Sequence, residues 1–379
     1  ELGRKKRERS LASMRESDAC VIVADPSSEE SLSVASEALS YAARNAPTAT
    51  PLLLLNVRGV AAAQSDAAVE KARARLGIEK VRSLAINLVE FGTGRTEATA
   101  AVTRWIESNV GKHTSEAPLM PPKAGLRSRE ATVMLNIPMD EETPSGRLLR
   151  PQSMMQEALL RNFVDTYAYR MDLRAARGGD GPEAKAAEER RFREVVDTLR
   201  ARGKLKLLVT DSQAIDIVDP WTLEKGSSSR ETVPITTFSI AMVNYLSAGA
   251  LPRFVDGLRT FEDLRRGDSV LICEACNHNR IVDDIGVSQI PRKIEQRFGH
   301  GIVKVEHAFG REYADGRNLS KYRLIIHCGG CMLDQQKMHS RIDELHKSGV
   351  PITNYGLLLS LMQSRSALKR VLRPYGISF

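Results

Sequence analysis

The first hundred residues alternate short apolar runs with longer helical patterns, and this order constrains the fold more than any other feature. The apolar runs cover 18–26, 50–57 and 81–88, and each precedes a helical pattern, at 28–45, 71–78 and 92–110. Strands that alternate with helices in this way form a parallel sheet with right-handed crossover connections. The sequence therefore predicts an α/β fold for its first region.

Composition limits the classes of protein to which this chain can belong. A chain of 379 residues with 42% hydrophobic and 27% charged residues suits two or three soluble domains. No apolar run reaches the roughly 18 residues that a membrane span needs. The net charge of +8 comes largely from two segments, 4–9 and 190–206, and aromatic residues are only 5%. We therefore expect neither a membrane nor a nucleic acid among the partners.

A segment rich in Pro, Gly and charge separates the first region from the rest of the chain. Residues 1–112 are predicted to be the first domain, 113–130 a linker, 131–245 a second domain and 246–379 a third. Both later domains also read as α/β. The chain has no initiator Met and begins in a charged segment, so we expect it to be a fragment of a longer protein.

Within the later domains, apolar and helical patterns give a coarse order of elements. Residues 131–139 read as a strand and 146–171 as a helix that continues after Pro151. The third domain contains strands at 268–276 and 322–328, a region rich in loops between them, and a helix at 332–349. Both of these strands end in cysteines, and ligand sites in open parallel sheets lie beyond the carboxyl ends of strands.

Four of the five cysteines fall into two Cys-x-x-Cys pairs, and the fifth is Cys20. This pattern is unlike a secreted disulfide framework and fits a reducing compartment. Side chains alternate along a strand, so Cys273 and Cys276 would point to opposite faces. Cys273 is better interpreted as a small buried hydrophobic residue. Cys276 and His278 would project to one side where the strand ends.

The second pair lies in "HCGGC" at 327–331. Its two glycines let the backbone approach a bulky ligand and let amides face sulfur. Cys331 is expected at a helix N-terminus, where the dipole stabilises a thiolate. Three thiolates with one or two imidazoles hold either zinc or an iron–sulfur cluster. A closed set of four ligands would indicate structural zinc, and three cysteines with a labile fourth position would indicate a [4Fe-4S] cluster.

At these residues the sequence resembles the HydF family of [FeFe]-hydrogenase maturation proteins, which are GTPases and scaffolds. The family signature is Cys-x-His, a gap of about fifty residues, and His-Cys-x-x-Cys. Here Cys276 and His278 are followed by 48 residues and then by His327, Cys328 and Cys331. Further similar stretches are "EACNHN", "YRLIIHCGGCML", "GVPITNYG", "GRLLRPQ" and "GKLKLLVTDSQA".

The resemblance implies that Cys276, Cys328 and Cys331 hold a [4Fe-4S] cluster. His278 would lie near the fourth iron or on it, and His327 is a weaker candidate because its side chain can point away from Cys328. An exchangeable iron site would let the protein carry a guest, the two-iron subcluster that bears CO, cyanide and a dithiolate bridge. The family builds this guest with the radical-SAM maturases HydE and HydG and delivers it to apo-hydrogenase. The middle domain resembles the family's dimerisation domain and implies a homodimer.

The first domain resembles only the second half of the family's Ras-like, P-loop GTPase domain. A P-loop is absent, because Gly111-Lys112 is followed by His113 and Gly203-Lys204 by Leu205. The guanine-reading Asn-Lys-x-Asp motif is reduced to Asn56-Val57-Arg58-Gly59. Asn56 is the one candidate for a guanine contact, and we predict that this chain does not bind GTP tightly. GTP and Mg²⁺ would belong only to a complete chain.

Two other functions stay open on the sequence. One is a GTP-hydrolysing maturase, if a P-loop precedes residue 1, and the other is a structural four-cysteine zinc protein that uses Cys273. The Ala- and Arg-rich composition and the charged segment 178–202 resemble a green-algal organellar protein. The expected compartment is therefore the cytoplasm, or the chloroplast stroma if the source is an alga.

Overall fold

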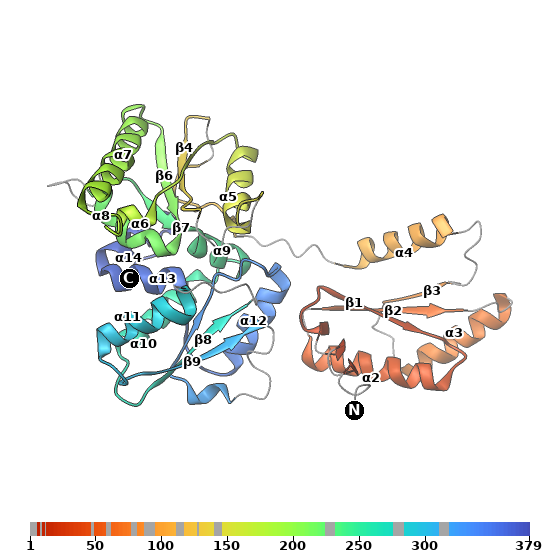
Figure 1. Cartoon of the computed structure of the whole chain (residues 1–379). Coiled ribbons are helices and arrows are strands. Elements are labelled where there is room, and N and C mark those ends of the chain that lie inside the picture. The colour runs from red at the N-terminus through yellow and green to blue at the C-terminus, as the bar shows by residue number, and fades with distance from the viewer. Residues whose placement is uncertain are drawn as a thin grey trace. The chain divides into compact units, whose positions relative to one another are not determined.

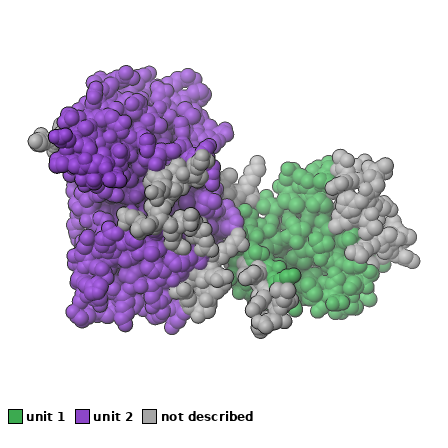
Figure 2. All heavy atoms as spheres, viewed as in Figure 1, with its two compact units in different colours: residues 1–114 green, residues 115–379 purple. Residues whose placement is uncertain are grey.

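The computed structural model describes most of the chain and divides it into two compact units, 1–114 and 115–379, coloured green and purple in Figure 2. The described residues are 6–7, 10–11, 13–46, 49–57, 62–76, 82–86, 95–110, 117–126, 129–139, 146–223, 232–275, 284–310 and 318–379. Each unit is built from α/β elements (Figure 1). The described part of the chain contains no helix that is long and apolar enough to cross a membrane.

The first unit has the strand and helix order that its sequence predicts. Its parallel sheet has the order β1-β2-β3, with Leu54 of the central strand beside Val23 on one side and Leu84 on the other. The strands are β1 (Ala19–Ala24), β2 (Thr50–Asn56) and β3 (Arg82–Ile86), and the helices are α2 (Glu29–Asn45), α3 (Ala62–Leu76) and α4 (Arg95–Asn109). Helix α2 begins after Ser28, whose hydroxyl accepts the amide of Ser31.

One face of β1 is open to solvent. Val21 is 42% exposed and Val23 is 56% exposed, although the alternate residues Cys20, Ile22 and Ala24 are buried. Parallel sheets usually carry helices on both faces. The strands β8 and β10 of the second unit, by contrast, are buried on both faces almost throughout.

The second unit contains two four-stranded parallel sheets. The first has the order β5-β4-β6-β7. Its strands are β4 (Thr132–Asn136), β5 (Asp165–Tyr169), β6 (Leu205–Thr210) and β7 (Ile235–Thr237). The helices of this part are α5 (Arg150–Arg161), α6 (Leu173–Ala176), α7 (Pro182–Ala201), α8 (Ile215–Trp221) and α9 (Phe238–Leu246). We call this part, 131–246, the middle region.

The second sheet has the order β11-β10-β8-β9 and lies in residues 251–379, which we call the C-terminal region. Its strands are β8 (Ser269–Glu274), β9 (Lys304–Phe309), β10 (Leu324–His327) and β11 (Ile352–Asn354). The helices are α10 (Leu251–Glu262), α11 (Ile290–Phe298), α12 (Gln335–Lys347), α13 (Tyr355–Gln363) and α14 (Arg365–Leu372). The expected α/β fold is therefore present in all three sheets.

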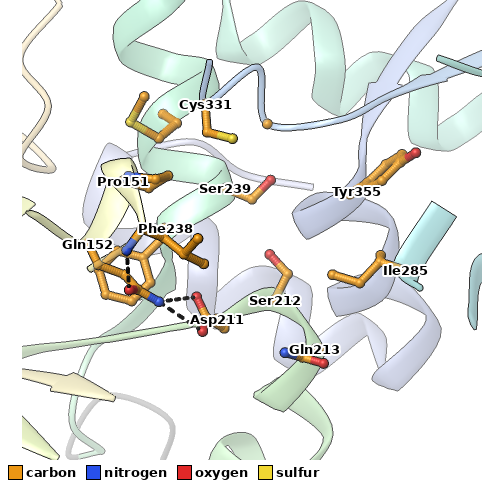
Figure 3. A pocket seen from close by; sticks show the side chains of 13 residues that line it. Pro151, Gln152, Asp211, Ser212, Gln213, Phe238, Ser239, Ile285, Cys331 and Tyr355 are labelled. Atoms are coloured by element: carbon orange, nitrogen blue, oxygen red, sulfur yellow. Dashed lines mark hydrogen bonds between the residues drawn. The ribbon is translucent and has the colours of Figure 1, made fainter. Parts of the chain in front are cut away.

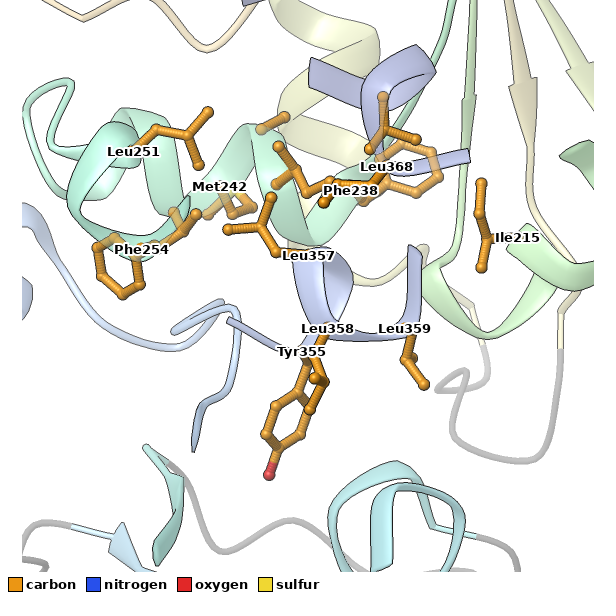
Figure 4. Close-up of a cluster of buried hydrophobic side chains, with 14 of the residues drawn as sticks. Ile215, Phe238, Met242, Leu251, Phe254, Tyr355, Leu357, Leu358, Leu359 and Leu368 are labelled. Atoms are coloured by element: carbon orange, nitrogen blue, oxygen red, sulfur yellow. The ribbon is translucent and has the colours of Figure 1, made fainter. Parts of the chain in front are cut away.

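One continuous hydrophobic core joins the middle and C-terminal regions. Helix α13 contacts α8 and α9 of the middle region as well as α10 and α14. Figure 4 shows Phe238 and Met242 of α9 close to Leu357 and Leu368. All four side chains are less than 4% exposed. Because so much apolar area is shared, the two sheets pack together within one compact unit.

Residues 117–126 belong to the predicted linker and pack on the second unit. Leu119 and Leu126 are buried in its core, and the amide of Lys123 donates to the carbonyl oxygen of Pro374 at 2.9 Å. The domain boundaries given above stay predictions.

The prediction of one continuous helix over 146–171 is wrong. Helix α5 ends at Arg161, and Phe163 has a φ of 58°, which turns the chain into strand β5. The guanidinium of Arg129 lies over the Phe163 ring at 4.3 Å from its centroid, so the turn residue has a packing partner. The region between 276 and 322, predicted to be mostly loop, also contains α11 and β9.

Candidate metal centre

The pairing of β8 with β10 brings the two cysteine motifs to one edge of the C-terminal sheet. The strands are parallel neighbours, with His327 opposite Cys273. The amide of Cys328 donates to the carbonyl oxygen of Cys273 at 3.0 Å. The chain therefore leaves both strands side by side, at the carboxyl edge where α/β sheets bind ligands.

The Cys328 thiol accepts two backbone amides in this edge. Ala275 N lies 3.2 Å from Cys328 Sγ, and Gly330 N lies 3.4 Å from it. Amide donors stabilise a thiolate and adjust the potential of a cluster that it binds. Ala275 directly precedes Cys276, so the two cysteine motifs are tied together at the Cys328 sulfur.

The two glycines of this loop have separate roles, in addition to the amide of Gly330 that faces the Cys328 sulfur as predicted. Gly330 has a φ of 66°, and a Cβ there would lie 3.2 Å from Met338 Sδ. A Cβ on Gly329 would lie 3.1 Å from Ser239 Oγ of α9. Gly330 thus supplies the left-handed backbone, and Gly329 allows close approach to the middle region.

Cys331 is half-buried in the turn that precedes α12. Its expected place at a helix N-terminus is wrong, because α12 begins at Gln335 and the carboxylate of Asp334 caps it by accepting the amide of Lys337 at 2.8 Å. The loop is held instead by Arg150, whose Nη1 donates to the carbonyl oxygens of Cys331 and Leu333 at 3.0 Å each. Sequence reasoning missed Arg150, since nothing in a sequence pairs residues so far apart.

His327 is buried, with 1% of its surface exposed, and both ring nitrogens have partners. Nδ1 lies 2.7 Å from the carbonyl oxygen of Cys328, and Nε2 lies 3.2 Å from Nε of Arg341. Arg341 can only donate, so Nε2 accepts and Nδ1 carries the proton. Burial, and then the charge of Arg341, lower the pKa of His327 to about 3. In this arrangement neither nitrogen is directed to a metal, and His327 stays a weak candidate.

Two predicted ligands, Cys276 and His278, remain, together with Cys273, which only the zinc alternative uses. Cys276 and His278 lie outside the described residues. Cys273 is fully buried in the hydrophobic core, which confirms its interpretation as a core residue. Among the residues that the structure describes, no group of three or more His, Cys, Asp or Glu side chains could hold a metal ion.

Glu274 and Tyr355 form a buried polar pair that sequence reasoning did not single out. The Tyr355 hydroxyl donates to Glu274 Oε1 at 3.1 Å, and burial, followed by the charge of Glu274, raises the pKa of Tyr355. Gly286 packs against both side chains, and a Cβ there would overlap them. Strand alternation was the available signal, because it sets Glu274 on the face opposite to Cys273.

A cavity of about 150 Å³ lies beside this edge (Figure 3). Ile285, Gly329, Cys331 and Tyr355 of the C-terminal region line one part of it, and side chains of the middle region line the rest. The middle-region residues are Leu149, Pro151, Gln152, Asp211, Ser212, Gln213, Phe238, Ser239 and Met242.

The candidate guanine contact Asn56 is the last residue of β2, at the carboxyl end of the central strand of the first unit. It is half-buried, and Val57 after it is buried. Arg58 and Gly59 lie outside the described residues. A strand end of this kind is where a nucleotide base would be read, but the structure adds no second contact.

Residues 252–374 match the family model of the hydrogen maturase F tetramerization domain. This match assigns residues 252–374 to the HydF family. The matched segment includes β8 and β10 and therefore both cysteine motifs at the sheet edge. A search of curated proteins gave no match. The match confirms the resemblance of the C-terminal region to HydF.

Proposed function

We propose that this chain is a scaffold and carrier in [FeFe]-hydrogenase maturation. Membership of the HydF family supports a role in that process. The proposal that the chain acts as a cluster-bearing scaffold rests on the contact between Ala275 N and Cys328 Sγ at 3.2 Å. This contact ties Ala275, the residue before Cys276, to the loop that holds Cys328 and Cys331.

These residues fit a [4Fe-4S] cluster. Cys276, Cys328 and Cys331 would hold three irons, and the glycine pair lets the loop pack closely against Ser239 and Met338. Such a cluster supplies a fourth iron that can take and release an external ligand. The backbone amides of Ala275 and Gly330 would stabilise the bound Cys328 thiolate, and Arg150 would keep Cys331 in place.

We assign the fourth position to His278 or to an exchangeable ligand rather than to His327. The two hydrogen bonds of the His327 ring support this choice, because binding a metal would break at least one of them. An exchangeable fourth position is what a carrier of the two-iron subcluster needs. The proposed partners are HydE, HydG and apo-hydrogenase.

The description of the matched domain also supports self-association of this chain. It concerns residues 252–374, whereas the homodimer was predicted from the middle region. Two self-associating surfaces in one unit would assemble dimers into tetramers.

Anaerobic reconstitution with iron and sulfide, followed by EPR of the reduced protein, tests the cluster. We expect a [4Fe-4S] signal and about four irons per chain. The signal should be lost in Cys276→Ser and Cys328→Ser. It should persist in Cys273→Ala and in Cys20→Ser, a matched control in the first unit.

Two results would contradict the proposal. Colourless protein that contains only zinc would favour the structural zinc site. Loss of metal in Cys273→Ala, in a variant that still unfolds cooperatively, would show that the core cysteine is a ligand.

A further inference from the structure

The cavity beside Cys331 has the size of a ligand site. Its volume is about 150 Å³, and a cavity of that volume accommodates a molecule of about six non-hydrogen atoms. The middle region contributes most of the wall, and Gly329, Cys331, Ile285 and Tyr355 of the C-terminal region contribute the remainder. A molecule in it would contact both regions at once.

Ser212 is the strongest sign that the cavity is built to bind something. The residue is 7% exposed, and its hydroxyl oxygen is buried without a hydrogen-bond partner. In Figure 3 this hydroxyl points toward the side chain of Ser239, across the cavity. A buried hydroxyl without a partner destabilises a fold, so such groups usually face water or a ligand.

Asp211 determines what kind of ligand fits. Its carboxylate lines the cavity next to Ser212 and accepts from Gln152 Nε2, which lies 3.3 Å from Oδ2 and 3.5 Å from Oδ1. Gln152 is itself 1% exposed, so the carboxylate is oriented by a buried amide. A carboxylate accepts hydrogen bonds and repels anions, which favours a ligand with a protonated amine.

The remaining walls define the rest of the ligand. Phe238, Met242 and Ile285 are apolar and suit a short aliphatic chain. Cys331 lies at another part of the wall, and its thiolate would hold the proposed cluster there. A ligand that spans the cavity would therefore have a soft donor for iron at one end and an amine at the other.

We propose that the cavity is a subsite for a small aminothiol-type ligand of the cluster. Its thiolate would bind the fourth iron, the one that no cysteine of the chain holds, and its ammonium would lie between Asp211 and Ser212. The thiol would lose its proton to solvent, its sulfur would replace the exchangeable ligand, which leaves to solvent, and no oxidation state changes. This inference rests on the proposed function, because the cluster supplies the iron.

The test compares two thiols of equal size on the reconstituted full chain. The probes are 2-aminoethanethiol and 1-propanethiol, which differ only in the amine. Binding is followed by the change in the EPR signal of the reduced cluster. We expect 2-aminoethanethiol to bind about tenfold more tightly or better, since a charge-assisted hydrogen bond is lost in the other probe.

Variants test whether the cavity causes the preference for 2-aminoethanethiol over 1-propanethiol. Asp211→Asn keeps the shape and should reduce the preference to about twofold or less, and Ser212→Ala should reduce it in part. Asp216→Asn is the matched control, because it removes the same charge from a residue of α8 that does not line the cavity. It should keep the full preference.

Equal binding of the two thiols would overturn the inference, and so would a preference that survives in Asp211→Asn. In that case the cavity holds water only. Iron per chain is measured on the same samples, so a failure to form the cluster, which would count against the proposed function, is seen separately.

Discussion

Arg150 donates hydrogen bonds to the carbonyl oxygen of Cys331 and to that of Leu333, and so fastens the cysteine loop to the middle region. Both distances are 3.0 Å and both bonds start from the same guanidinium nitrogen. Arg150 is the first residue of α5, so the position of the loop depends on a helix from the other sheet. A positive charge at this place also offsets the negative charge of thiolates.

Arg150→Ala should loosen the cysteine loop without unfolding the second unit. Hydrogen bonds from a charged donor contribute about 1.5–3 kcal/mol, so the reconstituted variant should release iron to a chelator roughly tenfold faster or more. Arg161→Ala is the control, because Arg161 pairs only with the exposed Glu157 of its own helix among the contacts described. Equal release from both variants would show that Arg150 does not position the loop.

Gly330→Ala should destabilise the second unit more than Gly349→Ala. The two glycines have φ values of 66° and 70°, so the left-handed backbone costs each alanine about 1–2 kcal/mol. Only Gly330 is crowded, by Met338 Sδ at 3.2 Å from the added Cβ, whereas nothing lies within 4 Å at Gly349. Urea unfolding midpoints measure the difference. Equal midpoints would mean that the loop shifts freely, and then cluster binding should be unaffected.

Arg370→Ala should be strongly destabilising. Its guanidinium, 5% exposed, pairs with the buried Asp219 and also donates to Thr222 Oγ1 and the carbonyl oxygen of Val233. Breaking a buried pair leaves an uncompensated charge and costs about 3–5 kcal/mol. Chemical unfolding measures this loss. Arg365→Ala on the same helix removes an exposed pair with Glu262 and should cost no more than about 1 kcal/mol.

Titration with a fluorescent guanine nucleotide should detect no binding at micromolar concentrations. The reason is the loss of the acidic residue that would accept from the guanine N1 and N2 groups, since Gly59 has no side chain. Nucleotide that binds in the micromolar range or tighter would overturn this prediction and favour the GTP-hydrolysing alternative. Asn56→Ala would then show whether the end of β2 is the base site.

Hydrophobic periodicity was sufficient to predict the strands and most of the helices from the sequence. Buried runs such as Leu52–Leu55 and Ile325–Ile326 are strands in the structure because both faces of a parallel sheet are covered. The continuous helix over 146–171 failed because its pattern does not reveal the left-handed φ of Phe163, a conformation that residues other than glycine rarely adopt. Strand β9 was missed for a related reason, since it is only half-buried and lacks a clear apolar run.

The cysteine motif, with its glycines and the core position of Cys273, could be read from the sequence alone, because strand alternation and backbone freedom are local properties. The register that sets His327 beside Cys273, the hold of Arg150 on the loop and the cavity with Asp211 and Ser212 needed the tertiary structure. These features join segments more than fifty residues apart. Local patterns say that a strand is buried, but the packing of all strands and helices together decides which strand becomes its neighbour.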